Sequence, residues 1–126
     1  MTRPHEVEIR WADLDAFGHV SHRAYVDFLE EARGAFLAGL IGAEHGRTLT
    51  IRRLAVDYLA QLTQADDRVR VTVRIEAVDG ACLTTAEEVF SAADGRLAAR
   101  ATCELRTSSP AATAALRALE APPQQG

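Results

Sequence analysis

Residues 11–33 read WADLDAFGHVSHRAYVDFLEEAR, and this stretch decides the fold that the sequence predicts. Two aspartates, a glycine and two of the four histidines stand directly before a helical pattern. The apolar residues of that pattern recur three and four positions apart, which is typical of an amphipathic helix. They are Tyr25, Phe28, Leu29, Ala32, Phe36, Leu37 and Leu40. Ser21 is the expected N-cap of this helix, because its hydroxyl can accept a hydrogen bond from a first-turn N–H group.

The other face of the predicted helix is polar. It is formed by four charged residues, Arg23, Asp27, Glu30 and Arg33. Gly34 lies inside the pattern, where glycine costs about 1 kcal/mol relative to alanine. We expect it to mark close packing or an early loosening of the helix.

Strand patterns occupy most of the remaining chain. Residues 5–11 alternate, with Val7, Ile9 and Trp11 on one face. After a loop over 43–47, residues 48–59 form a second strand, with a bulge expected at Arg52 and Arg53. Further strands are predicted over 68–78, 82–91 and 96–106, joined by turns at 79–80 and 93–95. Cys103 falls on the apolar face of the last strand, where it would pack as a small hydrophobic residue.

One long helix followed by antiparallel strands predicts an α+β fold, in which the helix covers one face of a five-stranded sheet. We expect one domain over residues 1–107. Residues 108–126 would add a short helix capped by Ser109, with Pro110 first in the helix, and a disordered tail. The open edges of such a sheet favour pairing with a second subunit.

Composition excludes several classes of function. The 126 residues carry a net charge of −4, and all 14 cationic residues are arginine. No basic block is present, so we expect no nucleic-acid partner. No apolar run is long enough to span a membrane, and the N-terminus lacks a signal-peptide pattern, which predicts a cytoplasmic protein. Nucleotide-cofactor motifs, a metal-ligand cluster and the GxSxG motif are all missing, so we expect no cofactor, no metal and no serine nucleophile.

The polar loop before the helix has the chemistry of an acyl-transfer site. Asp13 and Asp15 would point to opposite sides of an extended loop, so one is expected to be catalytic or to cap a turn. Gly18 permits a sharp turn. The free N–H groups of the first helical turn could hold an oxyanion, and a carboxylate nearby could act as nucleophile or general base. These are the minimal parts for hydrolysis of an ester or thioester.

The same stretch resembles the signature of hotdog-fold acyl-CoA thioesterases of the 4-hydroxybenzoyl-CoA thioesterase type. The matching residues are Asp13, Asp15, Gly18, His19, Val20, Tyr25, Phe28, Leu29, Glu30, Ala32 and Arg33. The later stretches LAVDYLAQLTQADDRVRV and GRLAARATCEL resemble the second strand and the last strand of that family. The likeness covers roughly residues 5–107.

The resemblance implies a five-stranded antiparallel sheet wrapped around one long central helix, with a homodimer or a tetramer of two dimers. It assigns the catalytic carboxylate to Asp15 and the oxyanion-holding N–H group to the backbone of His22, at a site on the dimer interface. The expected substrate is an acyl-CoA or acyl-carrier-protein thioester, with water as the second reactant and no cofactor. The remaining residues expected to bind substrate are Gly18, His19, Val20, Ser21 and Tyr25.

Several alternatives stay open. Ser21 and His22 replace an Asn-Asn pair that is common in the family, and His22 would stand where the acyl group passes. Some hotdog thioesterases use a helix glutamate, which makes Glu30 or Glu31 a second candidate. A hotdog dehydratase would pair His19 or His22 with Asp15, and a non-catalytic dimer would only bind acyl ligands.

Overall fold

The computed structural model describes residues 3–120, so most of the predicted tail lies outside the described residues. The strands are β1 (His5–Glu8), β2 (Thr50–Tyr58), β3 (Arg68–Asp79), β4 (Cys82–Ser91) and β5 (Leu97–Arg106). The helices are α1 (His22–Ile41), α2 (Ala43–Gly46) and α3 (Pro110–Glu120). All pairings are antiparallel, and the strand order is β1-β3-β4-β5-β2. The predicted α+β fold is therefore confirmed.

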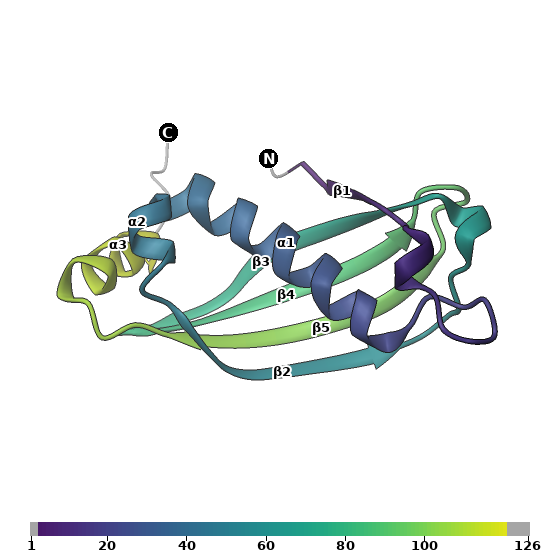
Figure 1. Cartoon of the computed structure of the whole chain (residues 1–126). Coiled ribbons are helices and arrows are strands. Elements are labelled where there is room, and N and C mark those ends of the chain that lie inside the picture. Colours follow the sequence, from purple (N-terminus) through teal and green to yellow (C-terminus); the bar gives the residue numbers. More distant parts are fainter. Residues whose placement is uncertain (1–2, 121–126) are drawn as a thin grey trace.

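The long helix α1 lies along one face of the sheet, as Figure 1 shows, with α2 and α3 near its C-terminal end. Its N-terminus lies at the opposite end, beside the loop that follows β1. Ser21 is the N-cap, as predicted, and its side chain accepts a hydrogen bond from the Arg23 N–H group. The main core is formed by apolar helix residues, including Phe28 and Leu29, packed on valines and alanines of the sheet. Burial of this stripe explains why the amphipathic pattern becomes a helix on a sheet.

Three local predictions were wrong. The first strand ends at Glu8 rather than residue 11, because its ladder with β3 ends where Glu8 faces Arg68. Trp11 instead begins a short 3-10 helix, and its side chain is 83 % exposed. Residues 43–46 form α2 rather than a loop, after Gly42 ends α1 with a φ of +90°. The predicted bulge in β2 is confirmed by a register shift between Ile51 and Arg53.

Gly34 marks neither close packing nor an early end of the helix. Helix α1 continues through it to Ile41, and a Cβ atom placed on Gly34 would meet no atom within 4 Å. The residue is exposed, so its place in the helix has no packing explanation among the described residues.

Helix α3 closes the second part of the core. Ala112 and Leu116 of this helix are buried, and Leu116 packs in a cluster with Leu83, Cys103 and Leu105. Ser109 caps the helix as predicted, accepting a hydrogen bond of 3.2 Å from the Ala112 N–H group. Burial raises the pKa of the Cys103 thiol to about 11, in agreement with its expected role as a small hydrophobic residue. Within residues 3–120, none of the helices has both the length and the apolar character to cross a bilayer.

Arg33 was expected on the polar face of the helix, but it is buried. Its Nε atom donates to Glu87 Oε2 at 2.7 Å, and Nη2 donates to Glu87 Oε1 at 2.9 Å. Thr85 adds a third hydrogen bond to the same carboxylate, at 2.6 Å. Burial alone would lower the pKa of Arg33, but the bonds and the charge of Glu87 raise it above its ordinary value. Arg33 therefore stays charged inside the core, and its bonds to Glu87 connect α1 to β4.

Substituting Glu87 tests how much the fold depends on this pair. Glu87→Ala leaves a buried guanidinium without its carboxylate, so the free energy of unfolding should fall by about 3–5 kcal/mol. Urea denaturation followed by circular dichroism measures the change. Glu88→Ala is the matched control, because Glu88 makes an exposed ion pair with Arg100 at 3.5 Å and should cost less than about 1 kcal/mol. Equal stability of the wild type and Glu87→Ala would contradict the assignment.

Candidate active site

The loop between β1 and α1 uses its two aspartates for different purposes. Asp13 is buried, and its carboxylate accepts hydrogen bonds from the backbone N–H (2.8 Å) and the guanidinium (2.9 Å) of Arg10. Burial by itself raises the pKa of Asp13, but these bonds and the charge of Arg10 lower it below its ordinary value. Its backbone carbonyl accepts a bond from the Ser21 N–H group at 2.8 Å. Asp13 therefore connects the end of the 3-10 helix to the N-cap of α1.

Asp15 is exposed and holds the turn that follows. Its Oδ1 atom accepts hydrogen bonds from the backbone N–H groups of Phe17 (2.8 Å) and His19 (3.1 Å). Gly18 adopts a φ of +81° here, which confirms the predicted sharp turn. The two backbone bonds lower the pKa of the Asp15 carboxyl, so it is ionised at neutral pH. Its Oδ2 atom accepts no hydrogen bond from the part of the chain that the structure describes.

The N-terminus of α1 stands beside this turn. Val20 donates its backbone N–H group to the Leu62 carbonyl at 2.8 Å, which attaches the loop to the segment after β2. The first helical residue is His22, and its backbone N–H group has no acceptor among residues 3–120. Such an N–H group at the positive end of a helix is suited to receive an oxyanion.

A hollow of about 410 Å³ connects these groups. Five of the residues predicted for the site line it: Asp15, His19, Val20, His22 and Tyr25. The other two predicted residues do not: Ser21 is buried beneath the helix N-terminus, and Gly18 lines a different hollow. Both remain in the loop that shapes the site.

The second wall of this hollow was missed by the sequence analysis. It consists of residues at and after the end of β2, namely Tyr58, Leu59, Ala60 and Gln61. Tyr25 and Tyr58 meet edge to face, with ring centroids 5.1 Å apart. The hydroxyl of Tyr58 donates to the His22 carbonyl at 3.4 Å, and that of Tyr25 donates to the Ala60 carbonyl at 3.4 Å. Burial raises the pKa of Tyr25 to about 12, so it stays a neutral donor.

A second hollow, of about 630 Å³, shares only Asp15 with the first. Its lining residues are Trp11, Ala12, Leu14, Asp15, Ala16, Gly18 and Arg23. The Asp15 turn thus borders two separate hollows.

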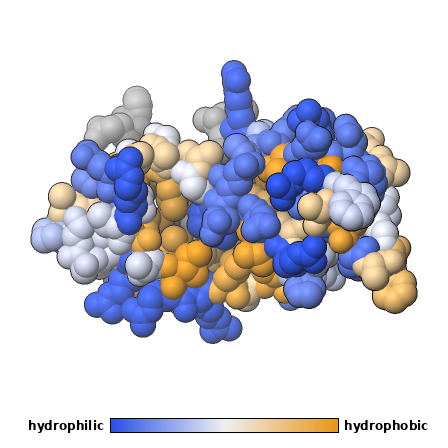
Figure 2. Space-filling view, in the orientation of Figure 1, coloured by the Kyte–Doolittle hydropathy of each residue, from blue (hydrophilic) through white to orange (hydrophobic). Residues whose placement is uncertain are grey.

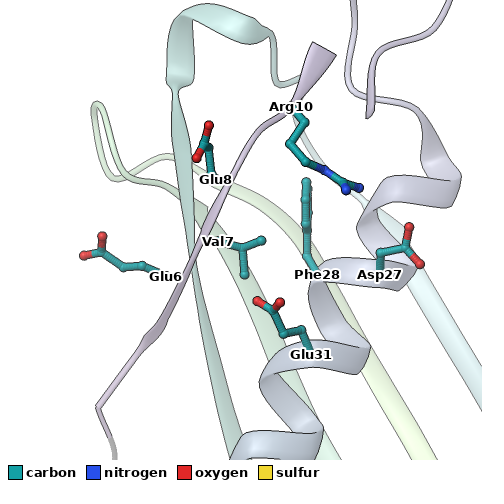
Figure 3. A pocket seen from close by; sticks show the side chains of 7 residues that line it. All are labelled: Glu6, Val7, Glu8, Arg10, Asp27, Phe28 and Glu31. Atoms are coloured by element: carbon teal, nitrogen blue, oxygen red, sulfur yellow. The ribbon is translucent and has the colours of Figure 1, made fainter. Parts of the chain in front are cut away.

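A third hollow, of about 300 Å³, lies between β1 and α1 (Figure 3) and has a different character. Its lining residues include four acidic ones, Glu6, Glu8, Asp27 and Glu31, and one cation, Arg10; the Glu6 carboxylate points away from α1 and pairs with Arg70 at 3.5 Å. In Figure 3 the Arg10 side chain extends toward Asp27, with Phe28 beside them. This excess of negative charge is unfavourable for an anionic ligand.

The two helix glutamates do not join the Asp15 site. Glu31 lines the acidic hollow, and its carboxylate bonds to the His5 imidazole at 2.9 Å. Glu30 is exposed and lines neither of the two hollows beside Asp15. Among residues 3–120, no hydrogen bond joins the imidazole of His19 or His22 to the Asp15 carboxylate.

Residues 3–120 also contain no group of three or more His, Cys, Asp or Glu side chains that could hold a metal ion.

Solved structures share this architecture. A thioesterase from Thermus thermophilus, in complex with coenzyme A and Zn, is 26 % identical over 97 % of this chain and 96 % of its own, with a TM-score of 0.77. A DHNA-CoA thioesterase from Staphylococcus aureus is 23 % identical over 82 % of this chain and 72 % of its own, with a TM-score of 0.72. A 1,4-dihydroxy-2-naphthoyl-CoA thioesterase from Synechocystis is 18 % identical over 95 % of this chain and 98 % of its own, with a TM-score of 0.75.

The fold is therefore the hotdog fold that the sequence predicted, with the sheet wrapped around α1. Comparison with curated proteins gave no match. The family model described as the thioesterase-like superfamily matches residues 9–113, which include the whole Asp15 loop, α1 and the sheet beyond β1. The chain belongs to the thioesterase-like superfamily.

Proposed function

We propose that the chain hydrolyses an acyl-CoA thioester to the free acid and coenzyme A, with Asp15 as the reacting carboxylate. One observation carries the proposal: the ionised Asp15 lines the same hollow as His22, and the backbone N–H group of His22 has no acceptor among residues 3–120. Family membership and the coenzyme A complex of the Thermus thermophilus thioesterase support the choice of substrate.

Two routes fit this arrangement. In the nucleophilic route, Asp15 Oδ2 bonds to the carbonyl carbon and the carbonyl oxygen takes up the electron pair. The return of that pair expels the thiolate, which is protonated by solvent, and water then cleaves the acyl–aspartyl anhydride to acid and carboxylate. In the general-base route, Asp15 takes a proton from the water that attacks the carbonyl carbon. The tetrahedral intermediate then collapses and expels the thiolate, which takes up a proton from Asp15 or from solvent. In both, the His22 N–H group would stabilise the oxyanion.

Three alternatives remain as predictions with distinct products. A carrier-protein thioesterase would release thiol only from acyl-carrier-protein substrates. A dehydratase using His19 or His22 would give an enoyl thioester without thiol release, and a non-catalytic binder would give neither product. A screen over aromatic, short-chain and long-chain acyl-CoAs, the corresponding acyl-carrier-protein thioesters and a 3-hydroxyacyl-CoA, with thiol release and enoyl formation both followed by absorbance, separates these cases. A cytoplasmic location likewise stays a prediction from the sequence.

Asp15→Asn tests the assignment of the catalyst. The amide keeps the shape of the side chain but is a poor nucleophile and base, so kcat should fall by about 10²- to 10⁴-fold. The rate is measured by thiol release from the best acyl-CoA in the screen. Asp27→Asn is the matched control, because it makes the same chemical change in the acidic hollow of Figure 3 and should leave kcat unchanged. Undiminished kcat in Asp15→Asn would contradict the assignment.

The pH profile follows from the lowered pKa of Asp15. The reactive form is the carboxylate, so kcat/KM should stay level as the pH falls toward about 4 and drop only when Asp15 is protonated below the ordinary value for aspartate. Returning enzyme from each pH to neutral before assay controls for acid unfolding. An acidic limb near pH 6–7 that His19→Gln or His22→Gln abolishes would instead assign the titrating group to a histidine.

We also propose that the enzyme is a homodimer that pairs through β2. In the described sheet β2 pairs only with β5, and it exposes Ile51, Tyr58 and the adjoining Leu59. Figure 2 shows hydrophobic surface between α1 and the lower rim formed by β2, and the rim itself also carries hydrophilic groups, since Arg52, Arg53 and Asp57 are exposed on β2. The unpaired backbone groups and exposed apolar side chains of such an edge strand favour pairing with another chain. Because Tyr58 and Leu59 also line the hollow beside Asp15, the partner would stand at the site.

Ile51→Lys tests this edge, because it places a charge on the pairing strand. Light scattering after size-exclusion chromatography should show a dimer for the wild type and a shift toward monomer for the variant. Arg74→Glu, a charge change on an exposed β3 residue, is the control and should stay dimeric. A monomeric wild type at micromolar concentration would refute the dimer.

A further inference from the structure

Arg23 is a cation in an unfavourable position. It lies in the first turn of α1, where the helix dipole favours negative charge. Its Nη1 atom donates to Ser21 Oγ at 2.7 Å, and its Nη2 atom donates to the Ala12 carbonyl at 3.0 Å. Both acceptors are uncharged, and these bonds use only two of the five N–H donors of a guanidinium. These two bonds connect the loop at Ala12 to the N-cap of α1, and the other donors of the guanidinium have no acceptor among residues 3–120.

No carboxylate of the described chain forms an ion pair with Arg23. Among residues 3–120, the carboxylate of Asp13 is within ion-pair distance of Arg10, and the Asp15 carboxylate is bound by backbone N–H groups instead. The backbone bonds from Phe17 and His19 lower the pKa of the Asp15 carboxyl most, and the charge of Arg23 adds a smaller effect in the same direction, as it also does at Asp13. Arg23 and Asp15 line the same hollow. The guanidinium therefore stands close to the proposed reaction centre with its charge unmatched by a direct ion pair.

The hollow around Arg23 adds a second observation. It shares Asp15 with the hollow that contains His22, and Arg23 is the one cation among its lining residues. The rest of the lining is apolar or small, including the indole of Trp11, which is 83 % exposed, and Leu14. Arg23 and most of these residues are exposed, so an anionic oxygen can reach the guanidinium and form charge-assisted hydrogen bonds with its remaining N–H donors. The acidic hollow of Figure 3 offers the opposite charge.

We propose that Arg23 is a specificity-determining residue that binds an anionic group of the thioester substrate in the Trp11 hollow. This inference rests on the proposed thioesterase function. Two parts of the substrate could supply the anionic oxygens: a carboxylate at the far end of the acyl group, or a phosphate of coenzyme A. In the first case, the acyl chain occupies the Trp11 hollow and the enzyme selects dicarboxylic acyl groups. In the second case, the hollow receives the coenzyme A half.

Four substrates separate the two sources. Glutaryl and pentanoyl thioesters differ in a terminal carboxylate, and each is prepared on coenzyme A and on pantetheine, which has no phosphate. In Arg23→Gln, kcat/KM should fall about ten- to hundredfold for the substrates that carry the recognised anion, because a charge-assisted hydrogen bond is lost. Loss on both glutaryl thioesters identifies the acyl carboxylate. Loss on both coenzyme A thioesters identifies the phosphate.

Two further variants make the result decisive. Arg23→Lys keeps the charge and should recover part of the lost kcat/KM, while Arg74→Gln removes an exposed arginine of β3 and should match the wild type on all four substrates. An equal loss on all four substrates in Arg23→Gln, or a change in oligomeric state, would overturn the proposal. In that case Arg23 would serve the fold or a contact between subunits. No loss on any substrate would overturn it as well.

Binding distinguishes failure of this inference from failure of the proposed function. If no thioester is hydrolysed by the wild type, the proposed function fails, and calorimetric titration with coenzyme A and with glutarate tests Arg23 directly. Binding of either probe that weakens about tenfold or more in Arg23→Gln would still support an anion site. Absence of binding by both probes to the wild type would refute it.

Discussion

The bidentate pair between Arg33 and Glu87 fixes α1 on the sheet, and the site depends on where α1 lies. Most side chains between the helix and the sheet are alanine, valine or leucine, whose packing is non-directional and tolerates small shifts. A guanidinium that must meet a carboxylate with two bonds, in a place without water, tolerates much less rotation or sliding. A bond from Thr85 holds the same carboxylate in place. The position of the helix N-terminus follows from this contact in the middle of the core.

The two aspartates of the loop before α1, Asp13 and Asp15, have different roles. Asp13 is buried and matched by Arg10, so its charge is used to hold the chain. Asp15 has one oxygen bound by backbone N–H groups, while the other accepts no hydrogen bond within residues 3–120. Because backbone N–H groups hold one oxygen, the Asp15 carboxylate is oriented without a direct ion pair. In the proposed reaction, preorganisation of this kind would keep the other oxygen available to the substrate or to water.

Much of the fold could be predicted from local sequence patterns. The strand at 82–91, the bulge near Arg53 and the cap at Ser21 depend on alternation, turn residues and capping, which neighbouring residues determine. Trp11 and Arg33 were misplaced because tertiary context overrides their local pattern. Trp11 continues an alternation whose ladder has already ended, and Arg33 is acceptable in the core only because Glu87, far along the chain, meets it.

The same limit applies to the site. Five residues of the hollow, three in the loop and two in the first turn of α1, lie within one motif and could be named from the sequence. Tyr58 and its neighbours reach the hollow from the end of an edge strand, and only the order of strands in the sheet brings them there. Site residues that lie within one contiguous motif could therefore be predicted from the sequence. The opposite wall of the hollow, which would contact the acyl group in the proposed reaction, could not.

The two cysteines have a practical consequence for any study of this protein. Cys103 is sealed in the core, whereas Cys82 is exposed at the start of β4, at the opposite end of the sheet from the Asp15 loop. Thiol reagents that detect released coenzyme A would also label Cys82, adding a background of one equivalent per chain. The same residue is a natural attachment point for a fluorophore, since a dye placed there would report on the protein without entering the hollows beside Asp15.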